Sequence, residues 1–163
     1  MTTFKMENAL NAHAQKEFYS SYLYLSMAAY SHELGFNGFA HWLKIQSKEE
    51  WGHAMKLYDY IIERGGRVLL HEIKKPPHDF KSIHSMVQQV LDHEQKVTAE
   101  LGKLYEESGK AKDHASQIML QWFVQEQVEE EASVSEILQK LKLVGEKSSS
   151  ILYLDKEMKK REG

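Results

Sequence analysis

Four stretches of this sequence carry apolar residues at helical spacing, and a glutamate interrupts each of these stripes near its middle. The glutamates are Glu17, Glu50, Glu94 and Glu130. The seam between packed helices is normally apolar throughout, and a buried ion is costly unless it is paired. None of the four stripes carries a lysine that could pair with these carboxylates. The pattern therefore indicates a bundle of helices whose interior holds a di- or trivalent cation.

Turn residues divide the sequence into four long helices and one short helix. The four long patterns end at Gly35, Gly65-Gly66, Ser108-Gly109 and Gly145. Glycine is favoured just after a helix because it readily adopts a left-handed backbone conformation, and Asp79 or Ser82 is suited to cap the third helix. We expect helices over about Thr3–Leu34, Phe39–Arg64, Asp79 or Ser82 to Glu107, Ala111–Leu143 and Ile151–Lys160.

The connections between these helices differ in length. Residues 35–38 form a tight turn, whereas residues 67–81 contain Pro76-Pro77 and are too long for one. Short connections join antiparallel neighbours, so the sequence predicts an all-α fold with two helical pairs joined by one long crossover. We expect a single domain over residues 1–163, with the bundle at about 3–144 and a short fifth helix at about 148–160.

Composition excludes several classes of function. The sequence contains no cysteine, which removes disulfides, thiolate metal sites and cysteine nucleophiles. Its formal net charge of −3 gives no support for a nucleic-acid partner. No apolar run approaches the length of a membrane span, and the first residues, Met1-Thr2-Thr3-Phe4-Lys5, lack a signal-peptide pattern. We therefore expect a cytoplasmic protein with no membrane contact.

The central polar residues have the chemistry of a metal site. Glu50 and His53 are three residues apart, so they share one face of their helix. The other polar residues at the same height are Glu17, Glu94, Gln127 and Glu130. Any one helical glutamate is usually solvated, but four stripes that agree favour a shared site. Carboxylates with one imidazole suit iron or manganese far better than they suit an apolar core.

Residues beside this site allow more than one interpretation. Tyr24 lies two turns after Glu17 on the same stripe, where it is either an amphipathic core residue or a hydrogen-bond donor and electron source beside the metal. Trp122 is one position off the inward stripe, so core packing is the default for it. In the charged run 129–131, periodicity turns Glu130 inward and Glu131 away. No role is predicted for His41, His71, His78, His84, His93 and His114.

These residues resemble the di-iron centre of the non-haem bacterial ferritins, and the likeness extends from Phe4 to about Lys160. In that family, one iron is held by a glutamate of the first helix and a Glu-x-x-His pair, which match Glu17, Glu50 and His53. The second iron is held by the bridging glutamate and two more, which match Glu50, Glu94 and Glu130. The resemblance implies a ferritin-like four-helix bundle with a short C-terminal fifth helix.

The resemblance also implies functions for neighbouring residues. A glutamine and a tyrosine of the family site match Gln127 and Tyr24. Bacterial members carry a third iron position on the side that faces the cavity, and its carboxylates match Glu49, Glu126, Glu129 and Glu130.

Two differences separate this sequence from other branches of the family. Bacterioferritins have a second Glu-x-x-His pair on the fourth helix, where this sequence has Gln127-Val128-Glu129-Glu130. They also have a haem-ligating methionine after the bridging glutamate, where this sequence has Trp51. The resemblance therefore implies a protein without haem. The DNA-binding mini-ferritins place their iron between subunits and lack a fifth helix, so the sequence does not resemble them.

The resemblance implies a ferroxidase that oxidises Fe(II) with dioxygen and stores the ferric product inside a homo-oligomeric shell of 24 subunits. The apolar residues 151–154 are compatible with such a shell, because so short an element needs a neighbour to cover it. They also fit a tail packed on its own bundle. Two other functions remain open: a di-iron redox enzyme of the peroxidase or oxygenase type, and a structural bundle without metal.

Overall fold

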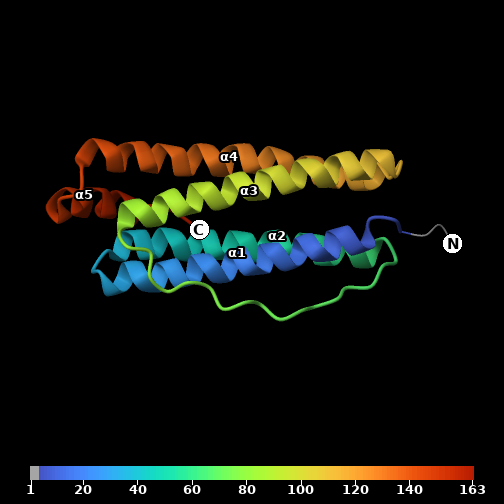
Figure 1. Ribbon diagram of the computed structural model, residues 1–163, viewed down its shortest axis with the longest axis horizontal. Coiled ribbons are helices and arrows are strands. Elements are labelled where there is room, and N and C mark those ends of the chain that lie inside the picture. The colour runs from blue at the N-terminus through green and yellow to red at the C-terminus, as the bar shows by residue number, and fades with distance from the viewer. Residues whose placement is uncertain (1–3) are drawn as a thin grey trace.

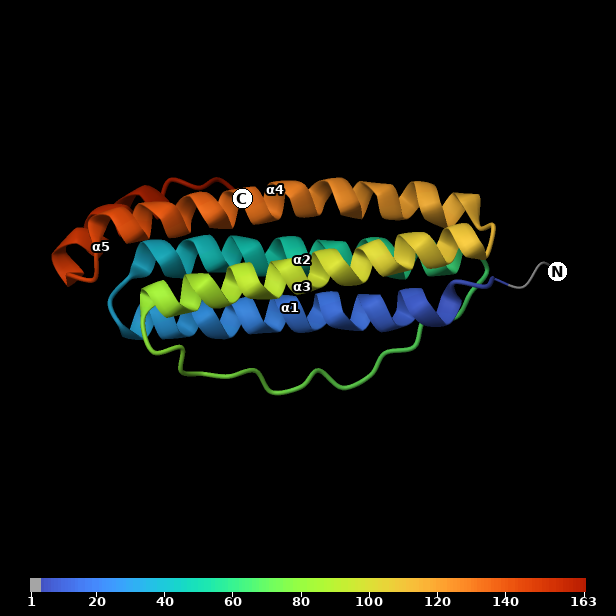
Figure 2. The ribbon, with the colours of Figure 1, turned by 45° about the horizontal axis from the view of Figure 1, so that its top comes forward.

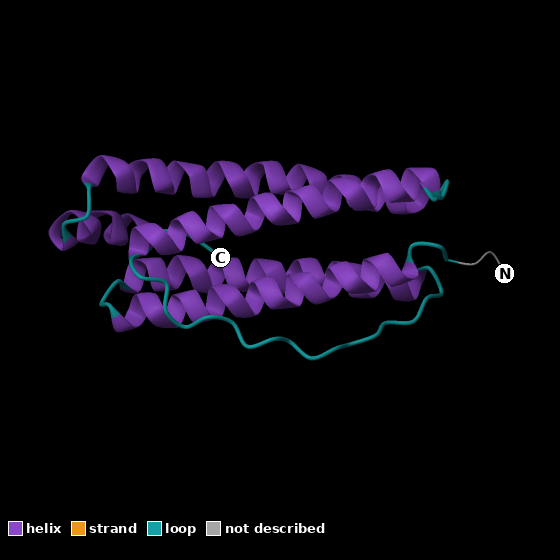
Figure 3. Ribbon diagram, in the orientation of Figure 1, coloured by secondary structure: helices purple, strands orange, loops and turns teal. Residues whose placement is uncertain are grey.

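The computed structural model describes residues 4–163, which fold into helices and loops without any strand (Figure 3). Its elements, in chain order, are α1 Glu7–Glu33, α2 Asn37–Glu63, α3 Ile83–Lys110, α4 His114–Val144 and α5 Ser148–Met158 (Figure 1). The all-α architecture is confirmed. The expected start of the first helix at Thr3 lies outside the described residues. None of the described helices combines the length and apolar character needed to cross a bilayer.

The helices pack as two pairs, α1 against α2 and α3 against α4. A long crossover, residues 64–82, runs outside the bundle from the end of α2 to the start of α3 (Figure 1). The short helix α5 packs on α2 and α4 at one end of the bundle. Beyond α5 the chain turns back along the bundle (Figure 2). This is the predicted arrangement of two pairs and one crossover.

Side-chain caps and left-handed glycines set half of the helix ends. The Ser82 hydroxyl accepts a hydrogen bond from the Ser85 backbone N–H at 3.0 Å, which satisfies a free donor in the first turn of α3. Gly35, Gly65 and Gly145 follow helix ends with φ values of 86°, 73° and 74°, a region that favours glycine. The predicted stops at these three glycines are therefore confirmed.

The predicted boundary between the third and fourth helices is wrong by a few residues. The third helix continues past Ser108-Gly109 to Lys110, and the left-handed residue is Lys112, with a φ of 56°. Asp113 then caps α4 by accepting from the Ser116 N–H at 3.1 Å, so α4 starts at His114 and not at Ala111. The strong aspartate cap decides the boundary here.

The fifth helix begins at Ser148, at the start of the expected range of about 148–160, and Ser148–Ser150 form its first turn, so the helical stretch expected from Ile151 is extended by one turn. Ile151 and Leu154 are buried against the chain's own bundle, whereas Leu152 is 47% and Tyr153 67% exposed. The apolar run 151–154 is therefore split between two faces. One face holds the tail on its own bundle, and the other is open to a neighbour.

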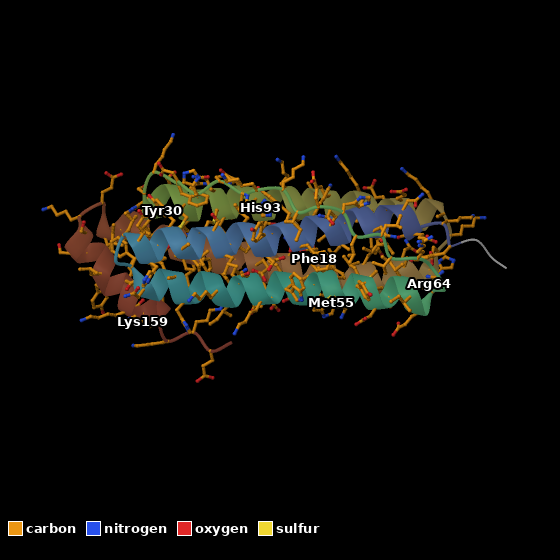
Figure 4. All side chains as sticks on the ribbon, turned by 90° about the horizontal axis from the view of Figure 1, so that it is seen from below. Phe18, Tyr30, Met55, Arg64, His93 and Lys159 are labelled. Carbon is orange, nitrogen blue, oxygen red and sulfur yellow. The ribbon has the colours of Figure 1, made fainter. Side chains whose placement is uncertain are left out.

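Two apolar clusters fill the ends of the bundle, and the polar residues lie between them. One cluster includes Tyr24, Phe39 and Val134, towards α5. The other includes Leu10, Leu57 and Leu101, towards the opposite end. In Figure 4, Lys159 and Arg64 mark these two ends, and Phe18 and His93 lie between them. The apolar ends supply the burial that holds four helices around a polar centre.

Candidate metal centre

The six central polar residues predicted from the stripes lie together inside the bundle. Each is at most 6% exposed, and they come from all four long helices: Glu17, Glu50, His53, Glu94, Gln127 and Glu130. Two groups bring one ligand atom from each member within 4.8 Å of the others. They are Glu17–Glu50–His53 and Glu50–Glu94–Glu130. Glu50 belongs to both groups.

Hydrogen bonds hold the second group in place. The Tyr24 hydroxyl, fully buried, donates to Oε1 of Glu94, and Nε2 of Gln127 donates to Oε2 of the same residue at 3.0 Å. Nε2 of Gln46 donates to Oε2 of Glu130. Donors that point at carboxylate oxygens orient them before any ion arrives. The structure thus favours the hydrogen-bond donor role for Tyr24 over simple core packing.

Two buried oxygens in the first group have no hydrogen-bond partner, Oε2 of Glu17 and Oε1 of Glu50. An unpartnered carboxylate oxygen in a dry site is costly. Nδ1 of His53 lies 3.2 Å from Oε2 of Glu50 and 3.9 Å from Oε2 of Glu17, so the imidazole faces the same space. A cation bound there would satisfy both orphaned oxygens, and hard carboxylate donors with one imidazole suit iron.

Burial shifts the protonation of the whole site. It raises the pKa of Glu50 and of Glu130 to about 8 and that of Glu94 to about 7, and it also raises the pKa of Glu17. Burial lowers the pKa of His53, but the hydrogen bond to Glu50 and the negative charges of Glu50, Glu17 and Glu130 together outweigh it, and the pKa rises to about 9. The buried carboxyl groups therefore favour their protonated forms at neutral pH, and a cation that bound there would displace these protons.

The carboxylates matched to a third iron position lie along one groove of about 490 Å³ on the α2–α4 side. Glu126 and Glu130 bring ligand atoms within 4.8 Å of each other and of His53. Glu129 is exposed, and Glu49 is engaged in an ion pair with Arg161. The four matched glutamates thus share a groove, but the group at ligand distance contains His53 in place of Glu49 and Glu129.

Sequence reasoning missed one residue beside the first group. Nε2 of His13 lies 2.8 Å from Oε1 of Glu17, and His13 is 2% exposed. Burial lowers the pKa of His13 to about 4, so the ring is neutral and its Nε2–H donates when Glu17 is ionised. The signal was available, because His13 lies four residues before Glu17 and so shares its helix face.

Two aromatic neighbours differ from expectation. Trp122 was predicted to pack in the core, but it is 37% exposed. Its ring stands edge-on to the His53 ring, with 5.5 Å between the ring centres, and the Lys56 ammonium lies 3.8 Å from the centre of the Trp122 ring. His93, given no role, packs edge-on against Tyr24 at 5.8 Å. His93 also lines a cavity of about 770 Å³ under the crossover, which contains none of the four central glutamates.

Comparison with known proteins gives consistent matches over nearly the whole chain. A family model described as a ferritin-like domain matches residues 7–144. The bacterial non-heme ferritin of Bacteroides fragilis is 40% identical over 161 residues, covering 99% of this chain and 100% of that protein. A probable bacterial non-heme ferritin-like protein of Haemophilus influenzae is 36% identical over 91% of this chain and 90% of its own length.

Solved structures match equally well. A structure described as a novel open pore ferritin from the hyperthermophilic archaeon Archaeoglobus fulgidus superposes with a TM-score of 0.96. It is 44% identical, with 99% of each chain covered. Another, described as a humanized archaeal ferritin, has the same TM-score and 45% identity over 99% of this chain and 98% of that one.

Proposed function

Because this chain belongs to the ferritin family, in its bacterial non-haem branch, and is an iron-storage protein, we propose that it oxidises the iron it stores. Fe(II) and dioxygen are the substrates, and the oxidation takes place between the four long helices. The residues that bind the two irons are Glu17, Glu50, His53, Glu94, Gln127 and Glu130.

The observation that carries this proposal is the pair of buried groups that share Glu50. Two carboxylate oxygens of the first group, one on Glu17 and one on Glu50, have no hydrogen-bond partner. A dry site with this many carboxylates is stable only with compensating positive charge. A purely structural bundle would gain nothing from keeping them, so metal binding is the function that accounts for their burial.

The chemistry follows from the two positions. Each of two Fe(II) ions gives one electron to the same dioxygen, which takes up two protons and leaves as hydrogen peroxide, with two Fe(III) as product. Carboxyl groups with pKa values of about 7 to 8, such as Glu94 and Glu130, release protons when iron binds and can supply them. Oxygen ligands favour the ferric over the ferrous state, which drives the reaction forward.

The two positions are chemically unequal. The first has the imidazole of His53, whereas the second has carboxylates and the nearby Gln127 amide. We infer that the second position releases Fe(III) more readily and that Glu126, Glu129 and Glu49 relay it into the interior. Tyr24, held against Glu94, is an additional electron donor in this scheme.

Storage requires a closed volume, and we propose that 24 copies assemble into a hollow cytoplasmic shell. The surface of the chain supports an assembly. Tyr22 and Leu25 on α1 are each 46% exposed, and Leu70 on the crossover is 68% exposed. With Leu152 and Tyr153 on α5, these apolar side chains are suited to contacts between subunits.

Aerobic loading with Fe(II), followed by size-exclusion chromatography with iron assayed in each fraction, tests the proposal. We expect iron far in excess of three per chain, eluting with a particle near the mass of 24 chains of 19.0 kDa. Two or three irons per chain on a small oligomer would contradict storage and point to a di-iron redox enzyme. A variant in which Glu17, Glu50, Glu94 and Glu130 are all glutamine is the matched control and should neither bind nor oxidise iron.

A further inference from the structure

The C-terminal tail beyond α5 brings a fixed positive charge to the metal centre. Nη2 of Arg161 lies 2.7 Å from Oε2 of Glu49, and Nη1 donates to Oε1 of Gln46 at 2.7 Å. Glu49 is separated from Arg161 by 112 residues in sequence. One guanidinium therefore spans two residues of α2, and both lie within one turn of the bridging Glu50.

Independent contacts hold the tail in this position. Oδ1 of Asp155, a buried residue, accepts a hydrogen bond from the backbone N–H of Phe39 at 2.9 Å, which fixes α5 on the start of α2. The close approach needs glycine at 38, because a Cβ there would lie 1.7 Å from the carbonyl oxygen of Asp155. Nε2 of His41 donates to the carbonyl oxygen of Arg161 at 2.8 Å. The placement of Arg161 is therefore a result of how α5 docks.

The positive charge of Arg161 lies in an acidic groove beside the proposed di-iron centre. Six glutamates line the groove, and its two basic residues, Lys160 and Arg161, both come from the C-terminal tail. A guanidinium stays protonated under all ordinary conditions, so the positive charge beside Glu49 is permanent while the tail is docked. A cation that binds Glu49 must displace Arg161 or be repelled by it.

Arg161 is also connected to the second group indirectly, through the side-chain amide of Gln46. The Gln46 side chain accepts from Arg161 with its oxygen and donates to Oε2 of Glu130 with its nitrogen. With a donor on one side and an acceptor on the other, the amide has one favourable orientation. Arg161 thus points the Gln46 N–H at Glu130, the carboxylate shared by the second group and the groove.

We propose that Arg161 is a tethered counter-cation that gates the passage of iron between the di-iron centre and the groove. With the tail docked, Glu49 is neutralised and closed to iron. When an ion enters the groove, the guanidinium leaves Glu49, and Gln46 is free to release Glu130. The inference rests on the proposed function, since it assigns a gate to the exit of the same site.

Calorimetric titration of the assembled, iron-free protein with Zn(II) at low salt tests the gate without any redox chemistry. Arg161→Gln removes the charge and should bind its third Zn(II) per chain about three- to tenfold more tightly than the unaltered protein, with the first two ions changed far less. Lys160→Gln is the matched control, because it removes the neighbouring charge of the same groove and leaves the Glu49 contact intact. Lys160→Gln should change the affinity for the third Zn(II) by less than about twofold.

Two further measurements separate a gate from general electrostatics. Arg161→Lys keeps the charge but not the planar guanidinium that spans Glu49 and Gln46. Its affinity for the third Zn(II) should therefore fall between the affinities of the unaltered protein and of Arg161→Gln. The higher affinity of Arg161→Gln for the third Zn(II) should also disappear at about 1 M ionic strength, where the Debye length is about 3 Å. Size-exclusion chromatography of each variant checks that the assembly is intact.

The gate is wrong if Arg161→Gln and Lys160→Gln shift the third affinity equally, if neither shifts it, or if no protein in the series binds a third ion. These outcomes are distinct from failure of the proposed function. Failure of the function would appear as an absence of Fe(II) oxidation in the unaltered protein, whatever the Zn(II) affinities of the variants are.

Discussion

The proposed di-iron centre and the neighbouring groove use the same residue type in opposite physical settings. In the centre, Glu17, Glu50 and Glu94 are each at most 2% exposed, and burial raises the pKa of each of them. In the groove, the Glu49 side chain is 42% exposed and is paired with an arginine. A buried carboxylate without its ion is costly, so we expect the proposed centre to bind a cation tightly. A solvated carboxylate binds weakly, which suits ions in transit.

Removal of Glu50, the residue shared by both groups, tests the comparison between the centre and the groove most directly. Glu50→Ala should slow aerobic Fe(II) oxidation by about 10- to 100-fold, because both ion positions lose a ligand. Glu49→Ala is the matched control one residue away and should leave the initial rate within about twofold. Stopped-flow absorbance at the ferric band measures both rates. An unchanged rate in Glu50→Ala would mean that oxidation occurs elsewhere.

The raised pKa values predict a second large effect, on stability without metal. Between pH 6.5 and 8.5 the unfolded carboxyl groups are ionised, whereas Glu50, Glu130 and Glu94 hold protons in the folded protein, up to pKa values of about 8, 8 and 7. His53, with a pKa of about 9, acts in the same direction. The folded state therefore binds more protons, and its stability falls as the pH rises.

The size of this loss should be on the order of 5 kcal/mol, which lowers Tm by about 10–20 °C for a chain of this length. Differential scanning calorimetry of the iron-free protein measures it, and saturating Zn(II) should flatten the dependence because the ions replace the protons. The window stops at pH 6.5, because His13, with its lowered pKa of about 4, acts in the opposite direction below that value. A Tm that is constant or rises from pH 6.5 to 8.5 would show that the central carboxylates are already ionised.

His13 offers a finer test of how the centre is pre-organised. His13→Leu removes the hydrogen bond to Oε1 of Glu17, and we expect about a tenfold loss in both the oxidation rate and the affinity for the first Zn(II). His13→Gln keeps a side-chain N–H and should recover most of both. If leucine and glutamine behave alike, the histidine fills space and does not orient Glu17.

The sequence predicted which polar residues meet inside the bundle, because each part of that pattern depends on one helix at a time. Glu50 and His53 share a face by their spacing alone, and Glu130 is separated from Glu131 by periodicity. The pairing of Glu49 with Arg161 was beyond such reasoning, because it depends on how α5 docks near Gly38 and where the tail runs afterwards. The length of the third helix was missed for a related reason: the Asp113 cap outweighed the local turn signal at Gly109.

The smallest effect, and the one that defines the boundary between the two regions, is expected for Glu129→Ala. Glu129 is exposed and lines the groove without belonging to either group that shares Glu50. The fast first phase of oxidation should therefore stay within about twofold of the unaltered rate. The iron oxidised per dioxygen, or the rate of reductive iron release, should change instead, because ions leave the second position by way of the groove. Oxygen-electrode stoichiometry and ferrozine-monitored release measure these two quantities. Loss of the fast phase would place Glu129 in the centre itself, and the division between a dry binding site and a wet exit would no longer hold.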